Sequence, residues 1–264
     1  MHEKLAAALQ AVWSLLPAMV TLLIAPGTMR AQQGADPYPF AVGNYWIYRG
    51  YVTETATYDQ GHWLPPETKQ RTWRSEITQV VYRKKGSEVR DALSSRISAA
   101  VFDDMVGSER LRFPVILVNV DSQRFYEIPD PVLPSGASGI PGVLLRVQNP
   151  DDGLPDLFRN TLILDLPLSP GKRWGPPFFS WKVTQLEKNP LIGLRGAEGN
   201  LNNEGFVLEA SDNTGTKRVT FVPGIGITYV WEESLFPRGD PNHWELDARL
   251  VEVHLKQATA PGAR

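Results

Sequence analysis

Residues 244–255 read WELDARLVEVHL, and this stretch decides the fold. Its core sets three apolar side chains against three charged ones: Leu246, Ala248 and Leu250 against Glu245, Asp247 and Arg249. Successive side chains point to opposite faces only in an extended strand. The stretch therefore predicts a β-strand with one buried face and one face in water.

Further strands are predicted because short apolar runs recur between turn residues, with 22 glycines and 22 prolines spread along 264 residues. Turn signals at this density are typical of a β-sandwich or barrel and break the chain too often for long helices. The sequence thus predicts a single all-β domain over residues 32–264. Its strands are expected at residues 45–57, 72–83, 88–102, 113–120, 124–128, 143–148, 160–166, 178–186, 206–210, 218–222, 227–232 and 244–255.

Three further segments are predicted as a hairpin connection and two surface loops. Residues 121–123 read as the connection of a hairpin, and residues 60–70 and 193–205 read as surface loops rich in Gly, Pro or Asn. Residues 88–102 also allow a helix, because Leu93, Ile97 and Ala100 fall at helical spacing. We favour the strand because both neighbouring segments are β-rich.

The first 31 residues are typical of a signal peptide. A short polar start precedes an apolar run over residues 5–25, and small and turn residues follow up to Ala31, after which we expect cleavage. The alternative is an uncleaved anchor, because about 20 apolar residues can span a bilayer. The sequence therefore predicts a periplasmic or secreted protein that meets a membrane only through this segment, if it is kept.

Charge and cysteine content exclude several function classes. The formal net charge is −2, which gives no electrostatic basis for binding nucleic acid. Without cysteine, the chain has no disulfide framework, no thiol catalysis and no cysteine-based zinc site. Stability is expected to come from burial alone.

One motif, Pro-apolar-x-x-Gly-x-x-Trp, occurs twice, at residues 39–46 and 167–174. Its glycine can adopt a positive φ in a tight turn, and its tryptophan can then close the mouth of a sheet. Trp46 and Trp174 are therefore either a ligand-facing pair or one structural device used at two strand entries. We favour the second interpretation, because large aromatic side chains usually pack in cores.

Together with Pro-Gly-Ile-Gly at residues 223–226, these motifs make the chain resemble a group of uncharacterised bacterial exported proteins. Those proteins carry Gly-Asn-x-Trp-x-Tyr, matched by residues 43–48, then Pro-Leu-x-x-Gly-x-x-Trp and Pro-Gly-Val-Gly. The resemblance implies a strongly curved antiparallel sheet, such as an open half-barrel like that of periplasmic lipoprotein carriers. The expected fold is therefore a curved antiparallel sheet of about ten strands, either an open half-barrel or a barrel or sandwich. The resemblance implies no catalytic residue.

No catalytic or metal-binding pattern stands out. His62, His243 and His254 show no i, i+2 or i, i+4 pairing, so we predict no metal site and no cofactor. Glu232 and Glu233, near Asp240 and His243, form the densest acidic group, but neighbours on a strand point to opposite faces. Residues 135–139 are interpreted as a flexible turn, because no Gly-x-Ser-x-Gly motif is present.

Binding is the function that remains. We predict an exported, non-catalytic protein that holds an apolar small molecule or an envelope protein against aromatic side chains. The candidate ligand-binding residues are Trp46, Tyr48, Trp174, Trp181, Tyr229 and Trp231. Two alternatives stay open: a carboxylate-using hydrolase or carbohydrate-active enzyme, and a structural envelope protein that binds others through its sheet edges. Convergence of these tryptophans on an open cavity favours binding, whereas a filled core favours the structural protein.

Overall fold

The structure is a computed structural model. It describes residues 38–54, 58–59, 62–83, 97–106, 109–110, 115–129, 139–148, 161–176, 180–197, 204–212, 215–236, 240 and 242–256. All of them belong to the second of the two units into which the chain divides, residues 36–264. The predicted signal segment lies outside the described residues.

Strands dominate the described residues. In chain order the elements are β1 (Tyr45–Glu54), β2 (Tyr58–Asp59), β3 (His62–Trp63), β4 (Glu67–Tyr82), β5 (Ile97–Val106), β6 (Glu109–Arg110), β7 (Val115–Val120), β8 (Arg124–Pro129), α3 (Gly139–Gln148), β9 (Leu162–Asp165), β10 (Arg173–Trp174), β11 (Ser180–Lys188), β12 (Glu204–Ser211), β13 (Gly215–Val222), β14 (Gly226–Ser234) and β15 (Glu245–His254).

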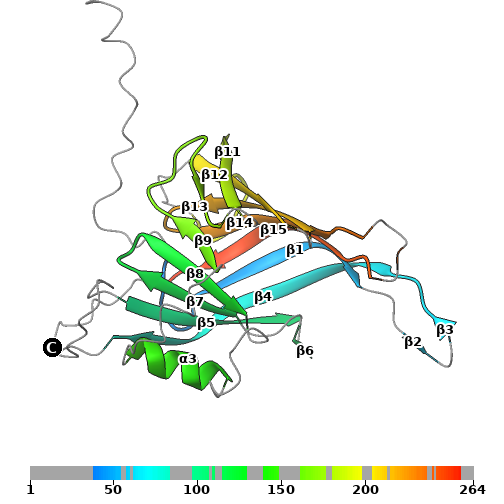
Figure 1. The fold of residues 1–264 in the computed structure, drawn as a ribbon, viewed down its shortest axis with the longest axis horizontal. Helices are drawn as coiled ribbons and strands as arrows, with labels where there is room; N and C mark the ends of the chain where they lie inside the picture. Colours follow the sequence, from blue (N-terminus) through cyan, green and yellow to red (C-terminus); the bar gives the residue numbers. More distant parts are fainter. Residues whose placement is uncertain are drawn as a thin grey trace, which may run out of the picture. The chain divides into compact units, whose positions relative to one another are not determined.

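One antiparallel sheet contains nearly all of these strands. Its order is β10-β11-β12-β13-β14-β15-β1-β4-β5-β7-β8-β9, and β6 adds to β5. The sheet curls into a nearly closed barrel (Figure 1). The seam lies between its two end strands, β9 and β10. The predicted all-β fold with a strongly curved antiparallel sheet is confirmed.

The strand that decided the fold, β15, is central in the sheet and alternates as expected. Ala248 and Leu250 are buried in the main core, whereas Asp247 and Arg249 are exposed. β15 pairs with β14 on one side and β1 on the other. The charged side chains of β15 therefore lie on the outer face of the barrel.

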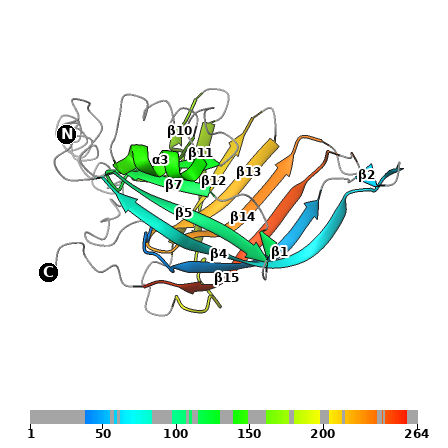
Figure 2. The same cartoon turned by 90° about the horizontal axis from the view of Figure 1, so that it is seen from below.

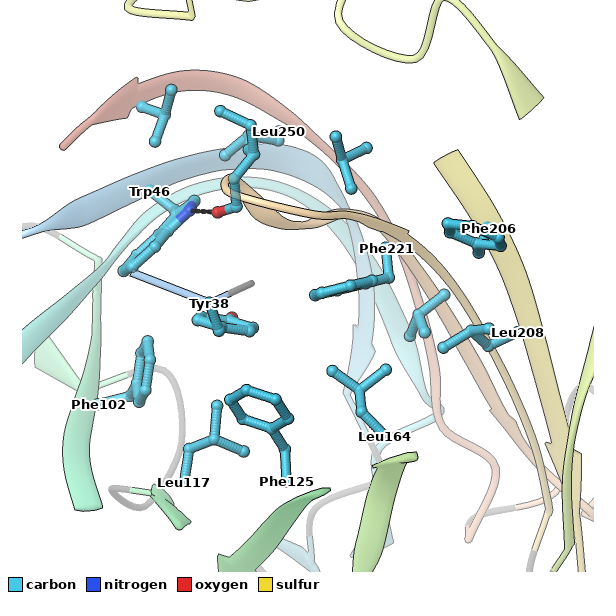
Figure 3. Packing of buried hydrophobic residues seen from close by; sticks show 14 of the residues in the cluster. Tyr38, Trp46, Phe102, Leu117, Phe125, Leu164, Phe206, Leu208, Phe221 and Leu250 are labelled. Atoms are coloured by element: carbon cyan, nitrogen blue, oxygen red, sulfur yellow. Dashed lines mark hydrogen bonds between the residues drawn. The ribbon is translucent and has the colours of Figure 1, made fainter. Parts of the chain in front are cut away.

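The inside of the barrel is filled by a residue that precedes the first strand. The Tyr38 ring is only 6% exposed. Its centroid lies 5.8 Å from that of Trp46, 5.9 Å from Phe102, 6.1 Å from Phe125 and 6.2 Å from Phe221. Figure 3 shows Tyr38 in the middle of side chains that come from opposite walls. The side chains on the concave face of the sheet thus pack around Tyr38, which precedes β1.

The segment that carries Tyr38 is held by side chains of the same region. Phe40 is buried beside Phe125, with ring centroids 6.2 Å apart. Asn44, fully buried, donates from Nδ2 to the Pro39 carbonyl at 2.9 Å and accepts from the Lys256 backbone N–H at 2.7 Å. Both the nitrogen and the oxygen of this buried side-chain amide are hydrogen-bonded, and breaking either bond would leave a buried polar group unpaired. Asn44 therefore positions the segment over residues 38–40.

Each copy of the recurring motif leads from a turn to a buried tryptophan. Gly43 and Gly171 both have φ of +83°, as the motif predicts. Trp46 donates from Nε1 to the Ile225 carbonyl at 2.7 Å, so the first motif is tied to the Pro-Gly-Ile-Gly turn. Gly226, with φ of +106°, lies so close to the Tyr38 ring that an added Cβ would stand 2.9 Å from Cζ. The turn thus makes room for Tyr38 and anchors Trp46.

The strand predicted at residues 143–148 is wrong, because these residues belong to helix α3. Val143, Leu144 and Val147 are buried, and their spacing places them on one face of a helix. In a segment of only six residues, this spacing cannot be told from that of a strand. The helix packs on the outer face of β4 and β5 (Figures 1 and 2). Val101 of β5 contacts this outer cluster, while its neighbour Phe102 faces the barrel interior.

No helix among the described residues is long and apolar enough to cross a membrane.

Other sequence predictions are confirmed or corrected in detail. The hairpin at residues 121–123 is confirmed, with positive φ at Asp121 and Ser122. The loop predicted at residues 60–70 is partly wrong: β3 forms there, and β4 starts at Glu67, because the long β1–β4 ladder continues into it. The strand preferred for residues 88–102 is observed from Ile97, and residues 88–96 lie outside the described part. Within the loop predicted at 193–205, β12 already begins at Glu204.

Gly50 allows β1 and β15 to approach closely, and its substitution gives a first testable prediction. An added Cβ would lie 2.0 Å from the Asp247 carbonyl oxygen and 2.5 Å from the Ala248 Cα, both rigid backbone atoms. We expect Gly50→Ala to lower the free energy of unfolding by about 1–3 kcal/mol, because the strands must separate. Urea denaturation measures it, with the exposed neighbour Arg49→Ala as control. An unchanged midpoint in Gly50→Ala would contradict this close approach.

Candidate functional site

Four of the six predicted ligand-binding residues lie inside the barrel. Trp46, Tyr48, Trp174 and Trp181 are buried in the main core. Trp174 stacks on Trp181 at a centroid distance of 6.5 Å, and the Tyr48 hydroxyl donates to the Ile227 carbonyl at 2.7 Å. These side chains belong to the core, and Tyr48 also lines the small interior cavity described below, but the four do not converge on one open hollow.

The other two predicted residues, Tyr229 and Trp231, lie on the outer face of β14. Trp231 is opposite Asp247 of β15, and Tyr229 is opposite Arg249, whose guanidinium carbon stands 4.8 Å from the Tyr229 ring centroid. Burial, and then the neighbouring Asp247 carboxylate, raise the pKa of Tyr229 above its ordinary value. The sheet therefore separates the six residues into an inner and an outer group.

The interior retains a cavity of about 90 Å³, walled partly by Tyr38, Phe102 and Leu117. Lys217 and Glu127 also line it, and Lys217 Nζ lies 3.6 Å from Glu127 Oε1. The same Nζ lies 3.8 Å from Oε2 of Glu232, a residue that does not line the cavity. An engineered apolar cavity of about 150 Å³ holds a benzene molecule, so the present cavity is smaller than one aromatic ring requires. Lys217 and Glu127 in its lining are moreover already paired with each other.

A larger cleft lies outside the barrel, where β15 meets the long β1–β4 hairpin. It measures about 390 Å³, and we call it the outer cleft. Tyr51 of β1 stands directly opposite Asp247 of β15, and both point outward. The lining is completed by the hairpin and by the residues that lead into β15: Tyr51, Thr53, Pro65, Pro66, Thr68, His243, Glu245 and Asp247. The cleft thus combines an aromatic and proline wall with an acidic floor.

One histidine is buried at the floor of the outer cleft. His243 is 2% exposed, and its Nδ1 lies 2.6 Å from the Phe236 carbonyl oxygen. A carbonyl only accepts, so Nδ1 carries the proton and donates. In the neutral ring Nε2 then presents its lone pair, and Nε2 has no hydrogen-bond partner although it is buried.

Two carboxylates stand beside this nitrogen. Glu233 of β14 is directly opposite Glu245, the first residue of β15, and His243 precedes Glu245 by two residues, just before the strand begins. The nearest ligand atoms of the three residues all lie within 4.8 Å of one another. Like charges directly opposite each other destabilise a sheet unless something compensates them.

The sequence indicated part of this cluster, because Glu233 and His243 belong to the densest acidic group. It did not indicate a metal site, because the cluster uses one histidine and two glutamates and the chain has no paired histidines. The i, i+2 spacing of His243 and Glu245 was visible, but the place of Glu233 depends on the register between β14 and β15. The expectation that Glu232 and Glu233 point to opposite faces fits the contacts, since Glu232 faces Lys217. Residues 135–138 lie outside the described part.

Comparison with known proteins adds little. No protein-family model and no curated protein matches the chain. A crystal structure of a presumed lipoprotein from Parabacteroides distasonis is similar to it with a TM-score of 0.32 and 10% sequence identity, over 83% of this chain and 99% of that one. A likeness this distant carries no conclusion about function, so the function must be inferred from the chain's own residues.

Proposed function

We propose that the chain is an exported, non-catalytic protein that binds an apolar group in the outer cleft. The size and lining of that cleft carry the proposal: at about 390 Å³ it falls within the range of about 300–1,000 Å³ that ligand pockets occupy. The interior cavity of about 90 Å³ is well below that range. Binding is therefore assigned to the outer face and not to the hollow that the aromatic content suggested.

The wall of the cleft selects an apolar group. Tyr51 is 56% exposed, although a tyrosine ring gains free energy when its face is covered. Pro65 and Pro66 provide a second apolar wall with little conformational freedom to lose on binding. An aromatic or aliphatic group between these walls would bury surface on both sides.

The floor of the cleft selects against anions. Glu245 and Asp247 lie there, and an anionic ligand would be repelled by both carboxylates. The preferred occupant is thus an apolar group that is neutral or carries hydrogen-bond donors. Such a group can belong to a small molecule or to a side chain of another envelope protein.

Substitution of Tyr51 tests the proposal. Nile red, a neutral apolar dye that fluoresces when it leaves water, serves as the probe. We expect the mature chain to bind it and Tyr51→Ala to weaken binding at least about 10-fold, because one aromatic wall is lost. Tyr82→Ala is the matched control, since Tyr82 is 51% exposed but does not line the cleft.

A second control separates the two cavities. Val115→Phe narrows the interior cavity and leaves the outer cleft unchanged, so dye binding is expected to survive it. Loss of binding in Val115→Phe with retention in Tyr51→Ala would place the ligand inside the barrel and refute the proposal. No binding by the folded wild type would instead favour the structural envelope protein, which a filled core also suits.

The natural source of the apolar group is a separate question. Mass spectrometry of an organic extract of the purified mature protein detects a small molecule that co-purifies. A molecule found with the wild type and absent from Tyr51→Ala would identify a small ligand. An envelope protein that crosslinks to the cleft in the wild type and not in Tyr51→Ala would identify a partner.

A further inference from the structure

We propose that Glu233, His243 and Glu245 form a binding site for a divalent transition-metal ion, with zinc as the best match. This proposal goes beyond the binding of an apolar group and does not depend on it. It stands on the buried, unpartnered nitrogen of His243 and on the two carboxylates gathered around it.

The histidine is oriented as metal-binding histidines are. Such residues almost always donate their second ring N–H to a carbonyl or carboxylate, which fixes the tautomer and directs the free lone pair to the metal. His243 does so through Nδ1 to the Phe236 carbonyl at 2.6 Å. Without a ligand, a buried acceptor such as Nε2 is costly, so an occupant at this position would remove a penalty.

The backbone around His243 is held on both sides. The His243 N–H donates to the Asp240 carbonyl at 3.0 Å, and the next N–H, that of Trp244, donates to Ser234 Oγ at 3.0 Å. The Ser234 N–H returns a bond to the Trp244 carbonyl at 3.0 Å. The ring therefore has a fixed position relative to β14 and β15, as a preorganised ligand requires.

The carboxylates supply the remaining ligands and the charge. Glu245 Oε1 accepts from Trp231 Nε1 at 3.4 Å, and its Oε2 lies 3.9 Å from His243 Nε2. Around a tetrahedral zinc, ligand atoms about 2.0–2.2 Å from the metal stand roughly 3.3–3.6 Å apart. The observed spread is within 4.8 Å, so rotations that move the two glutamate side chains by about 1 Å would bring the atoms to that separation. A cation also neutralises the repulsion between Glu233 and Glu245.

The donor set determines the class of ion. One imidazole and two carboxylates suit zinc and its first-row neighbours, whereas calcium and magnesium prefer oxygen ligands alone. Three protein ligands leave a fourth position of a tetrahedral zinc open. Because His243 and Glu245 line the outer cleft, a bound ion would stand at its floor.

Metal titration of the chelator-treated mature protein tests the site with the ion alone. We expect one equivalent of Zn²⁺ to bind in calorimetry and to raise the unfolding temperature, because the folded state alone holds the three ligands together. Co²⁺ should give the visible absorption of a four- or five-coordinate ion. His243→Gln and Glu233→Gln are each expected to weaken Zn²⁺ binding at least about 10-fold.

Matched controls keep the result interpretable. His254→Gln and Glu209→Gln alter exposed or half-buried residues of the same types outside the cluster, so they should bind Zn²⁺ as the wild type does. Glu233 is only half-buried, so its variant reports on binding even if His243→Gln fails to fold. Absence of stoichiometric binding in the wild type overturns the proposal, and so does binding that persists in folded Glu233→Gln. Neither outcome bears on Nile red binding through Tyr51.

Discussion

Trp46→Ala is expected to lower the free energy of unfolding by about 3–5 kcal/mol, the range for removing a large buried aromatic side chain. The Trp46 side chain is 1% exposed and packs against Tyr38 and Phe102. Its loss also leaves the Ile225 carbonyl without the indole N–H that it accepts at 2.7 Å. Urea denaturation followed by circular dichroism measures the change.

The control for this result is a tryptophan of the outer face. Trp231 is half-buried, and its ring lies beside Arg218 and Asp247 instead of in the core. Trp231→Ala should therefore cost about 1 kcal/mol. Equal losses of unfolding free energy in the two variants would contradict the placement of Trp46 in the core and Trp231 on the outer face.

Tyr38→Ala is expected to lower the free energy of unfolding by about 3–5 kcal/mol and to open the interior. Tyr38 contacts both walls of the barrel and lines the existing cavity, so its removal enlarges that cavity within apolar surroundings. Dry apolar cavities of sufficient size take up benzene or xenon. Calorimetric benzene binding should therefore appear in the variant and be absent from the wild type.

Tyr45→Ala controls for the loss of any tyrosine near the first strand. The Tyr45 ring stacks on His254 at a centroid distance of 5.1 Å, outside the main core. This substitution should produce no benzene binding and a smaller loss of stability. Benzene binding by the wild type, or none by folded Tyr38→Ala, would contradict a barrel interior filled by Tyr38.

The fold was predictable wherever one face of a strand is buried and the other is exposed to solvent. β15 is the clearest case, because its alternation follows directly from the period of an extended chain. Helix α3 was read as a strand because the run around Val143, Leu144 and Val147 is too short to separate a helical period from a strand. β5 was ambiguous for another reason: it buries both faces, one against the barrel interior and one against α3, so the alternation is hidden.

The candidate site was less predictable, because it depends on contacts between distant segments. Nothing local marks Tyr38 as a core residue, since it precedes the first strand between two prolines. Without that residue the aromatic content suggested a hollow interior. The outer cleft joins Tyr51 and Pro65 to His243, residues far apart in sequence, so only the register of β1, β4 and β15 brings them together.

The position of the Tyr38 ring is the most direct test of the filled interior, and nuclear Overhauser spectroscopy can measure it. In mature protein labelled on tyrosine and phenylalanine, Tyr38→Phe identifies the Tyr38 ring signals by their loss. We predict cross-peaks from that ring to Phe102, Phe125 and Phe221, whose centroids lie within 6.2 Å of it. A Tyr38 ring without these cross-peaks and accessible to a soluble paramagnetic agent would mean that the barrel is hollow.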